Sequence, residues 1–246
     1  MHFMLPEIFG VDVKYVGHSQ ADLIGIGSII DAYWRKRRRP YFWQRRPWRE
    51  LAVWGSGFMS SDSADEWPQR LRYHAVRGPL SAARVPNGDA LALGDPAILL
   101  PKIWAGPKDK TCKVLVVPHF ATHQKFTSTF ENDLPKNWKV LDLRSDPKDV
   151  CEQIAGSEFV VTSSLHGLIV SDAYGVPSCR IFPTGKIKGD GFKFKDYEAQ
   201  RGKKFSGPFL FQNVLAGEID MHSSEFAPAV PSDEVLERLI ASFPFR

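Results

Sequence analysis

Two serines and a histidine stand close together in the segment VVTSSLHG, residues 160–167. The apolar residues before Ser163 predict a buried strand, and the pattern from Leu165 onward predicts a helix. A helix start carries partial positive charge and N–H groups without a helical acceptor, so this turn is suited to bind an anion. The hydroxyl groups of Ser163 and Ser164 would add hydrogen-bond donors to such a site.

His166 falls in the first turn of that predicted helix. The positive charge there disfavours the imidazolium ion, so we expect a neutral ring that can accept a proton. Gly167 follows, and its missing side chain is expected to leave room for a ligand. The alternative is purely structural, with the serine pair as an ordinary N-cap and the histidine in a local hydrogen bond. Spacing alone leaves both interpretations open.

Basic side chains occupy two other places where a ligand could bind. Arg77 follows the strand-like run 71–76, and it could hold a carboxylate or phosphate with two hydrogen bonds or form a surface ion pair. Lys193 and Lys195 flank one phenylalanine, so in an extended segment they would point the same way and form a cationic clamp near Asp196. A solvated charged loop is the alternative for this second group.

Further residues follow predicted strand ends and could line a cleft. The turn Gly55-Ser56-Gly57 could approach a ligand closely, although such a turn alone is a weak signal. His119 and His123 are four residues apart, but no nearby acid completes a ligand set, so no metal site is predicted. The candidate cleft-lining residues are Gly55, Ser56, Asp95, His119 and Asp196.

The composition is that of an ordinary globular protein, with 246 residues, 43% hydrophobic residues and a net charge of +4. Three widely spaced cysteines without a CxxC pattern indicate a reducing compartment. We expect no signal peptide, because a basic region followed by an apolar one is missing at the start. No run approaches the roughly 18 apolar residues that span a bilayer. A cytoplasmic protein is therefore expected.

One strongly basic run begins at Arg35 and ends at Arg49, and it interleaves arginines with four aromatic residues. It could form a nucleic-acid patch, with arginines on phosphates and stacked aromatic rings. It could instead lie on anionic lipid headgroups with its tryptophans at the interface. A solvated loop with inward-facing tryptophans is the third interpretation and the favoured one, and nucleic acid is the least favoured.

Short apolar runs alternate with helical stretches along the chain, which predicts βαβ units and parallel sheets. The turn-rich segment 106–110 is interpreted as a linker. We therefore expect an amino-terminal domain over residues 1–107 and a carboxy-terminal domain over residues 108–246. A short strand, a glycine turn and a helix start are predicted in this order within residues 21–33. Further strands are predicted at 50–54, 71–76, 90–93, 112–117, 139–143, 158–162 and 178–182, and helices at 147–154, 165–174 and 233–243.

Several of these segments, taken in order, resemble the polysaccharide pyruvyltransferase family. They are LIGIGSI (23–29), VWGSGF (53–58), VRGPLS (76–81), LGDPA (93–97) and SSLHGLIVSDAYGVP (163–177), while KFKDY (193–197) resembles the exopolysaccharide branch of the family. The resemblance implies a glycosyltransferase-B-like α/β fold, with two Rossmann-like domains facing a cleft, the amino-terminal domain on the acceptor side and the carboxy-terminal domain on the donor side. The family usually begins with a further strand–turn–helix, so the amino-terminal domain of this chain would be shortened.

The resemblance also implies an activity, the transfer of a pyruvyl group from phosphoenolpyruvate to two hydroxyls of a sugar to give a cyclic ketal. The sugar would belong to a surface polysaccharide or exopolysaccharide or its lipid-linked precursor. A lipid-linked acceptor would bring the basic run from Arg35 to Arg49 to the inner face of the cell membrane. No cofactor, metal or nucleic acid is required. His166 would be catalytic, and the donor would be held by Arg77, Ser163, Ser164, Leu165, Lys193 and Lys195.

One departure from the family pattern matters at this site. The family typically has Arg-Leu-His where this chain has Ser164-Leu165-His166. Either Lys193, Lys195 or Arg77 replaces the missing positive charge, or the activity is reduced. Two other functions stay open. The same fold class serves glycosyltransferases that use nucleotide sugars, and a relative without catalysis could bind glycans or anions.

Overall fold

The computed structural model describes residues 3–17, 20–33, 50–61 and 71–245. The basic run from Arg35 to Arg49 lies outside these residues, so its three interpretations stay predictions. The chain forms two compact units. The first comprises residues 1–96, 189–202 and 232–246, and the second comprises residues 97–188 and 203–231.

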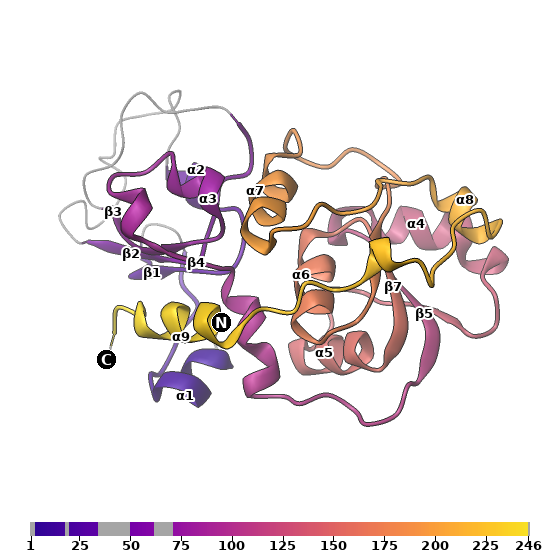
Figure 1. The fold of residues 1–246 in the computed structure, drawn as a ribbon, viewed down its shortest axis with the longest axis horizontal. Coiled ribbons are helices and arrows are strands. Elements are labelled where there is room, and N and C mark those ends of the chain that lie inside the picture. Colours follow the sequence, from indigo (N-terminus) through magenta and orange to yellow (C-terminus); the bar gives the residue numbers. More distant parts are fainter. Residues whose placement is uncertain (1–2, 18–19, 34–49, 62–70, 246) are drawn as a thin grey trace. The chain divides into compact units, whose positions relative to one another are not determined.

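The first unit is built on a parallel sheet of four strands in the order β1-β2-β3-β4 (Figure 1). The strands are β1 (Leu23–Ile24), β2 (Leu51–Trp54), β3 (Leu71–Val76) and β4 (Ala92–Leu93). Its helices are α1 (Met4–Phe9), α2 (Ile30–Tyr33), α3 (Pro79–Ala82), α7 (Phe192–Arg201) and α9 (Asp233–Ala241). Strand β2 is buried along its whole length, which explains its unbroken apolar sequence.

The second unit has its own parallel sheet, in the order β6-β5-β7-β8. The strands are β5 (Cys112–Val117), β6 (Trp138–Val140), β7 (Ser157–Thr162) and β8 (Ser178–Arg180). The helices are α4 (His123–Phe130), α5 (Pro147–Ala155), α6 (Leu165–Ala173) and α8 (Phe211–Leu215). Short 3-10 helices span Gly88–Ala90, Pro96–Lys102, Phe120–Thr122, Glu131–Asp133 and Ser224–Phe226.

The two faces of the second sheet have different coverings. One face packs a phenylalanine-rich core with Val114, Val116, Val161 and the side chains of α4 and α8. Helices α5 and α6 pack together beside β7, and α6 also contacts β8 (Figure 1). Successive strand residues point to opposite faces, so Thr162 belongs to the face that α6 covers. This placement brings the start of α6 to the carboxyl end of β7.

The predicted α/β class with parallel sheets is confirmed, and the units differ from the predicted domains. Residues 189–202 and 232–246 pack with the first unit, whereas the prediction placed them in the carboxy-terminal domain. Residues 97–107 belong to the second unit, whereas the prediction placed them in the amino-terminal domain. In α9, the carbonyl of Leu239 accepts a hydrogen bond of 3.0 Å from the indole of Trp54. Phe243 stacks on Phe9 with ring centroids 3.9 Å apart. A local pattern of strands and helices does not predict tertiary contacts between residues so far apart in the sequence.

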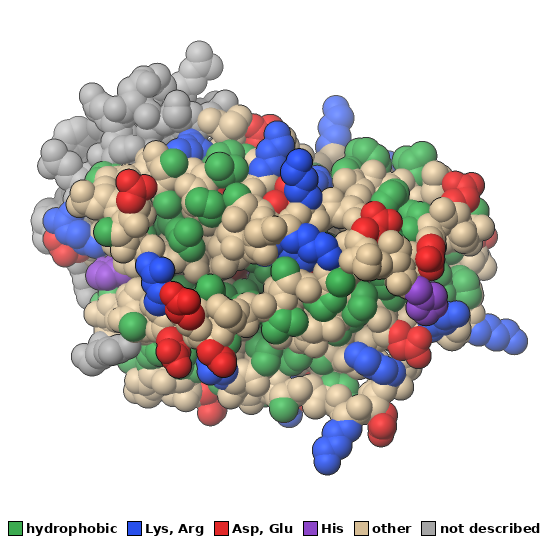
Figure 2. Space-filling model, viewed as in Figure 1, with side chains coloured by type: hydrophobic (Ala, Val, Ile, Leu, Met, Phe, Trp, Pro, Cys, Tyr) green, Lys and Arg blue, Asp and Glu red, His purple; other side chains and the backbone are tan. Residues whose placement is uncertain are grey.

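Cys112, Cys151 and Cys179 are free and buried. Burial raises the pKa of Cys151 to about 11 and that of Cys179 to about 12, so neither thiol is reactive near neutral pH. On the face drawn in Figure 2, basic and acidic side chains are interspersed over the described surface. Among the described helices, none is both long and apolar enough to cross a membrane.

Candidate functional site

The second unit joins two strand ends into one polar edge. The hydroxyl of Ser163, after β7, accepts a hydrogen bond of 2.9 Å from the backbone N–H of His119, after β5. Thr162 Oγ1 donates to the carbonyl of Val117 at 2.6 Å and accepts from the N–H of Ser164 at 2.9 Å. Ligands of open α/β sheets bind at the carboxyl ends of the strands, which is where these residues lie.

The serine pair and the histidine occupy the predicted turn and first helical turn. Ser164 is the N-cap residue of α6, yet its hydroxyl makes no capping hydrogen bond. Ser163 and Ser164 are 3% and 4% exposed, and His166 is partly buried in the first turn. Ser164 therefore occupies the N-cap position, as the structural alternative predicted, but its hydroxyl does not cap the helix. Its hydroxyl stays at a helix start, where an anion would be favoured.

Gly167 has a different role from the predicted one. A Cβ added at this position would overlap Oγ1 of Thr162 and lie 3.0 Å from its Cβ. The missing side chain therefore lets α6 pack tightly against the end of β7, and it does not leave room for a ligand. The glycine is needed because Thr162 fixes the turn through its own hydrogen bonds.

Substitution of Gly167 by alanine is expected to lower the free energy of unfolding by about 1–3 kcal/mol, the usual cost of overpacking a core. Urea unfolding followed by circular dichroism would measure it. Gly17→Ala is the matched control, because nothing lies within 4 Å of its added Cβ. Equal stability of Gly167→Ala and the unchanged protein would contradict the packing role.

His119 and His123 do not converge on a metal site in the described chain. The Nδ1 atom of His119 accepts a hydrogen bond from the N–H of Ala121 at 3.2 Å. His123, on α4, lies 3.8 Å from Asp142. Hydrogen bonds from Arg144 lower the pKa of Asp142 to about 2, so this carboxylate is already paired with a cation. No group of three or more metal-binding side chains occurs among the described residues.

Arg180 is a candidate site residue that the sequence interpretation missed. It pairs with Thr162 in the register of β7 and β8. Paired residues on neighbouring strands present their side chains on the same face, and the strands lie about 4.8 Å apart. The Arg180 backbone is held on both sides, since its N–H donates to Ser206 and its carbonyl accepts from Phe209. A basic residue therefore stands beside the serine turn on the face that α6 covers.

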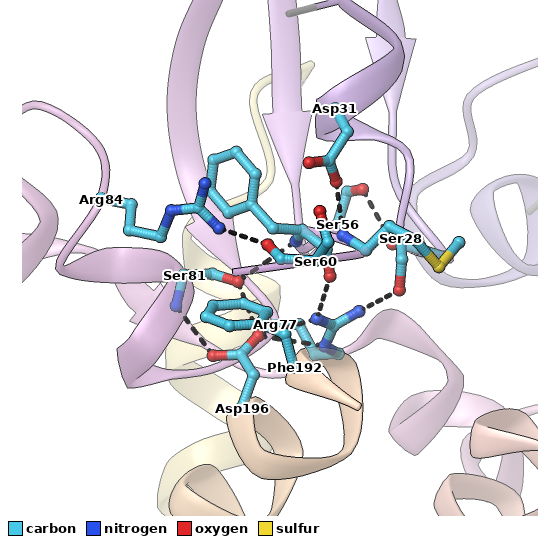
Figure 3. A network of polar contacts seen from close by, with 12 residues as sticks. Ser28, Asp31, Ser56, Ser60, Arg77, Ser81, Arg84, Phe192 and Asp196 are labelled. Atoms are coloured by element: carbon cyan, nitrogen blue, oxygen red, sulfur yellow. Dashed lines mark hydrogen bonds and ion pairs between the residues drawn. The ribbon is translucent and has the colours of Figure 1, made fainter. Parts of the chain in front are cut away.

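Arg77 lies in the first unit, at the centre of a buried polar network (Figure 3). Its side chain and that of Asp196 are both fully buried, with Nη2 2.9 Å and Nε 3.1 Å from the same carboxylate oxygen. Its remaining bonds go to the Ser28 hydroxyl at 2.5 Å and the Phe58 carbonyl at 2.8 Å. Every nitrogen of this guanidinium therefore contacts a protein oxygen, an arrangement that differs from both the anion clamp and the surface ion pair.

Asp196 is equally well satisfied. Its two oxygens accept from the N–H of Ser81 at 2.8 Å and from the Ser81 hydroxyl at 2.6 Å. A Cβ at Gly78 would overlap the Asp196 backbone, so the glycine permits the close approach of α7. The motifs VRGPLS and KFKDY thus form one interlock, in which Arg77 and Asp196 fix α7 on β3 and α3.

The other predicted cleft residues of the first unit lie in the same set of loops. Gly55 has a φ of +82°, and a Cβ there would overlap the ring of Pro96, so this turn approaches the protein's own chain. The Ser56 hydroxyl donates to Gly27 at 2.9 Å. Asp95 is fully buried. The glycine turn is therefore needed for close packing within the protein. That Gly55, Ser56 and Asp95 line a cleft stays a prediction.

Lys193 and Lys195 do not form the expected extended clamp. Both lie in helix α7, where residues two apart point to different sides. Lys193 is 7% exposed, whereas Lys195 is exposed. The solvated charged loop that was the alternative is not formed either, because the buried contacts of Asp196 hold this segment as a helix.

A cavity of about 890 Å³ lies at the edge of the second sheet where the strands begin, opposite the edge with the serine turn. Its lining includes Lys113 and Glu158, from the amino-terminal parts of β5 and β7, together with His222. None of the predicted site residues lines it. In open α/β sheets the ligand edge is the other one, so this cavity is not part of the candidate site.

Parallel α/β sheets with polar side chains gathered at their strand ends define a class of protein that binds small ligands at that edge. Within this class, the chain belongs to the polysaccharide pyruvyl transferase family, whose sequence model matches residues 6–181. The resemblance stated from the sequence motifs is thereby confirmed.

Two relatives show how far the similarity extends. The succinoglycan biosynthesis protein ExoV of Rhizobium meliloti (strain 1021) is 29% identical over 192 residues, covering 73% of this chain and 54% of that protein. An uncharacterized protein of Acanthamoeba polyphaga mimivirus is 25% identical over 172 residues, covering 66% of this chain and 60% of that protein. The chain therefore spans little more than half the length of these relatives. No solved structure matches it significantly.

Proposed function

We propose that the protein transfers a pyruvyl group from phosphoenolpyruvate to two hydroxyls of a sugar in a surface polysaccharide or its precursor, forming a cyclic ketal. Family membership supports this class of transferase. We further propose that the two four-stranded parallel sheets belong to two Rossmann-like domains of a glycosyltransferase-B-like fold. The observation that carries the proposal is the edge where the serine turn at the start of α6 stands directly before His166.

The reaction needs a group that accepts and donates protons and a site that holds the negative charge of phosphoenolpyruvate. The proton that reaches the methylene carbon of phosphoenolpyruvate comes from the first sugar hydroxyl, whose oxygen bonds to the adjacent carbon. The second hydroxyl then bonds to the same carbon as the bond to phosphate breaks, and its proton leaves with the phosphate. His166 suits the proton transfers because imidazole both accepts and donates near neutral pH.

The donor's negative charge is held, in this proposal, by the serine turn and by Arg180. The turn offers two hydroxyls and the positive end of α6. Arg180 supplies the full positive charge that the family carries on an arginine at the position of Ser164. Arg77 acts as a positioning residue instead, because its hydrogen bonds go to Asp196, Ser28 and Phe58.

Substitution of Arg180 by glutamine is expected to lower kcat/KM for phosphoenolpyruvate about 100-fold, because the loss of one preorganised cation typically costs that much. The melting temperature should stay close to that of the unchanged protein. Steady-state release of inorganic phosphate at varied donor concentration measures the effect. Lys113→Gln, at the opposite edge of the sheet, is the matched control. A kcat/KM within twofold of the control would remove Arg180 from the donor site.

The proposed function is tested by thermal shift and by product analysis. We expect phosphoenolpyruvate to raise the melting temperature and nucleotide sugars to leave it unchanged. The reverse result would favour a nucleotide-sugar-dependent glycosyltransferase. Stabilisation by phosphoenolpyruvate without phosphate release, over a broad panel of acceptor sugars, would instead indicate a binding protein without catalysis.

A further inference from the structure

Exposed apolar side chains of the second unit gather at the same edge as the serine turn. Phe120, Phe182 and Leu210 are 56%, 51% and 55% exposed. Phe120 follows β5 and Phe182 follows β8, the two strands that flank β7. Leu210 is joined to this edge because the N–H of Phe182 donates to the carbonyl of Phe209. Val230, 60% exposed, is the remaining large apolar side chain of that exposure in the described part of this unit.

Phe120 is connected to the proposed donor site by a short chain of contacts. The Ser163 hydroxyl accepts from the N–H of His119 at 2.9 Å. The His119 ring is oriented by the hydrogen bond that its Nδ1 accepts from Ala121. Its centroid lies 4.6 Å from that of Phe120, with the planes inclined by 30°. The two rings therefore form a tilted pair next to the serine turn.

Such a pair has the chemistry of a sugar subsite. One face of a pyranose ring is lined by C–H groups, which carry partial positive charge, and an aromatic face carries partial negative charge. Contact between them also removes apolar surface from water. Exposed apolar side chains that gather in one place can mark a ligand-binding surface, and here they adjoin the proposed donor site, where an acceptor sugar must meet its donor.

We propose that Phe120, supported by His119, is the platform on which the acceptor sugar ring stacks beside the donor. The inference rests on the proposed function, since it takes the acceptor to be a saccharide. Phe120 contributes affinity for the acceptor and places its hydroxyls toward the serine turn. Phe182 and Leu210 extend the same apolar rim on the other side of β7.

Direct binding tests this subsite without requiring turnover. Saturation-transfer NMR with methyl glycosides of glucose, galactose and mannose would compare the unchanged protein with Phe120→Ala, Phe120→Trp and the control Val230→Ala. Val230 is matched in exposure, and it lies near Gly175 beyond the far end of α6. We expect the saturation transferred to the ring protons of the glycosides to be at least fivefold smaller with Phe120→Ala than with the unchanged protein. Phe120→Trp and Val230→Ala should give the same transfer as the unchanged protein.

Kinetics then separates the subsite from the reaction. Phe120→Ala should raise KM for the acceptor about 10-fold or more, with KM for phosphoenolpyruvate unchanged. Unchanged glycoside binding and acceptor KM in Phe120→Ala would overturn the subsite and leave the transferase proposal standing. Phe120-dependent glycoside binding without any phosphate release would keep the subsite and refute the transferase. Sedimentation with phosphatidylglycerol vesicles tests a lipid surface instead. If Phe120→Ala loses only the sedimentation that the unchanged protein shows, and keeps glycoside binding, then Phe120 contacts lipid and the proposal is overturned.

Discussion

Replacement of His166 by alanine is expected to lower kcat for pyruvyl transfer about 10²–10⁴-fold, the range that a positioned acid–base group contributes. Phosphoenolpyruvate should still bind, because its charges contact the serine turn and Arg180 in the proposed site. The rate of transfer falls because no other group in the serine turn can both accept and donate a proton near neutral pH. Phosphate release at saturating donor and acceptor concentrations is the measurement.

The control for this variant is His222→Ala, since His222 lines the cavity at the other edge of the same sheet. It should keep full activity. His166→Gln separates hydrogen bonding from proton transfer, and it should be as inactive as the alanine variant because an amide side chain does not act as an acid or a base near neutral pH. Full transfer by His166→Ala, with a confirmed ketal product, would refute the catalytic role.

Replacement of Arg77 by methionine is expected to lower the free energy of unfolding of the first unit by about 3–5 kcal/mol. The methionine fills much of the space, but it leaves the Asp196 carboxylate buried without its cation. The Ser28 hydroxyl and the Phe58 carbonyl lose their donor as well. Urea unfolding gives the magnitude, and hydrogen exchange of the α7 amides shows where the structure opens.

Two further variants make the Arg77 prediction specific. Arg77→Met combined with Asp196→Leu should recover a large part of the lost stability, because a buried ion pair can often be replaced by apolar side chains. Arg72→Met removes the exposed ion pair with Glu50 and should cost less than about 1 kcal/mol. Protection of α7 amides in Arg77→Met equal to that in the unchanged protein would contradict the interlock.

The strands were predictable from sequence because each is a short apolar run between turn residues. Strand β7 and helix α6 match the prediction closely, since Gly175 and Pro177 end the helix by local chemistry. Neither the helical conformation of α7 nor its position was predicted from the sequence. Its position depends on Asp196 meeting Arg77, 119 residues earlier in the chain, and no local pattern contains that contact.

The candidate site divides in the same way. The serine turn, the helix start and His166 lie within a few residues, so their spacing alone indicated the site. Arg180 was missed because only the pairing of β7 with β8 places it beside Thr162. Gly167 was misinterpreted because its clash partner, the Thr162 hydroxyl, is oriented by a neighbouring strand. Sequence spacing identifies groups on one segment, whereas register between strands identifies the rest.

The central claim is tested most directly by the fate of carbon-labelled phosphoenolpyruvate. The protein would be incubated with donor labelled with ¹³C at the phosphate-bearing carbon and with p-nitrophenyl hexopyranosides of glucose, galactose and mannose. The account predicts a ¹³C signal of a ketal carbon, formed in step with inorganic phosphate and abolished in His166→Ala. Release of a nucleoside diphosphate from sugar nucleotides, with no phosphate from phosphoenolpyruvate on any acceptor, would contradict it.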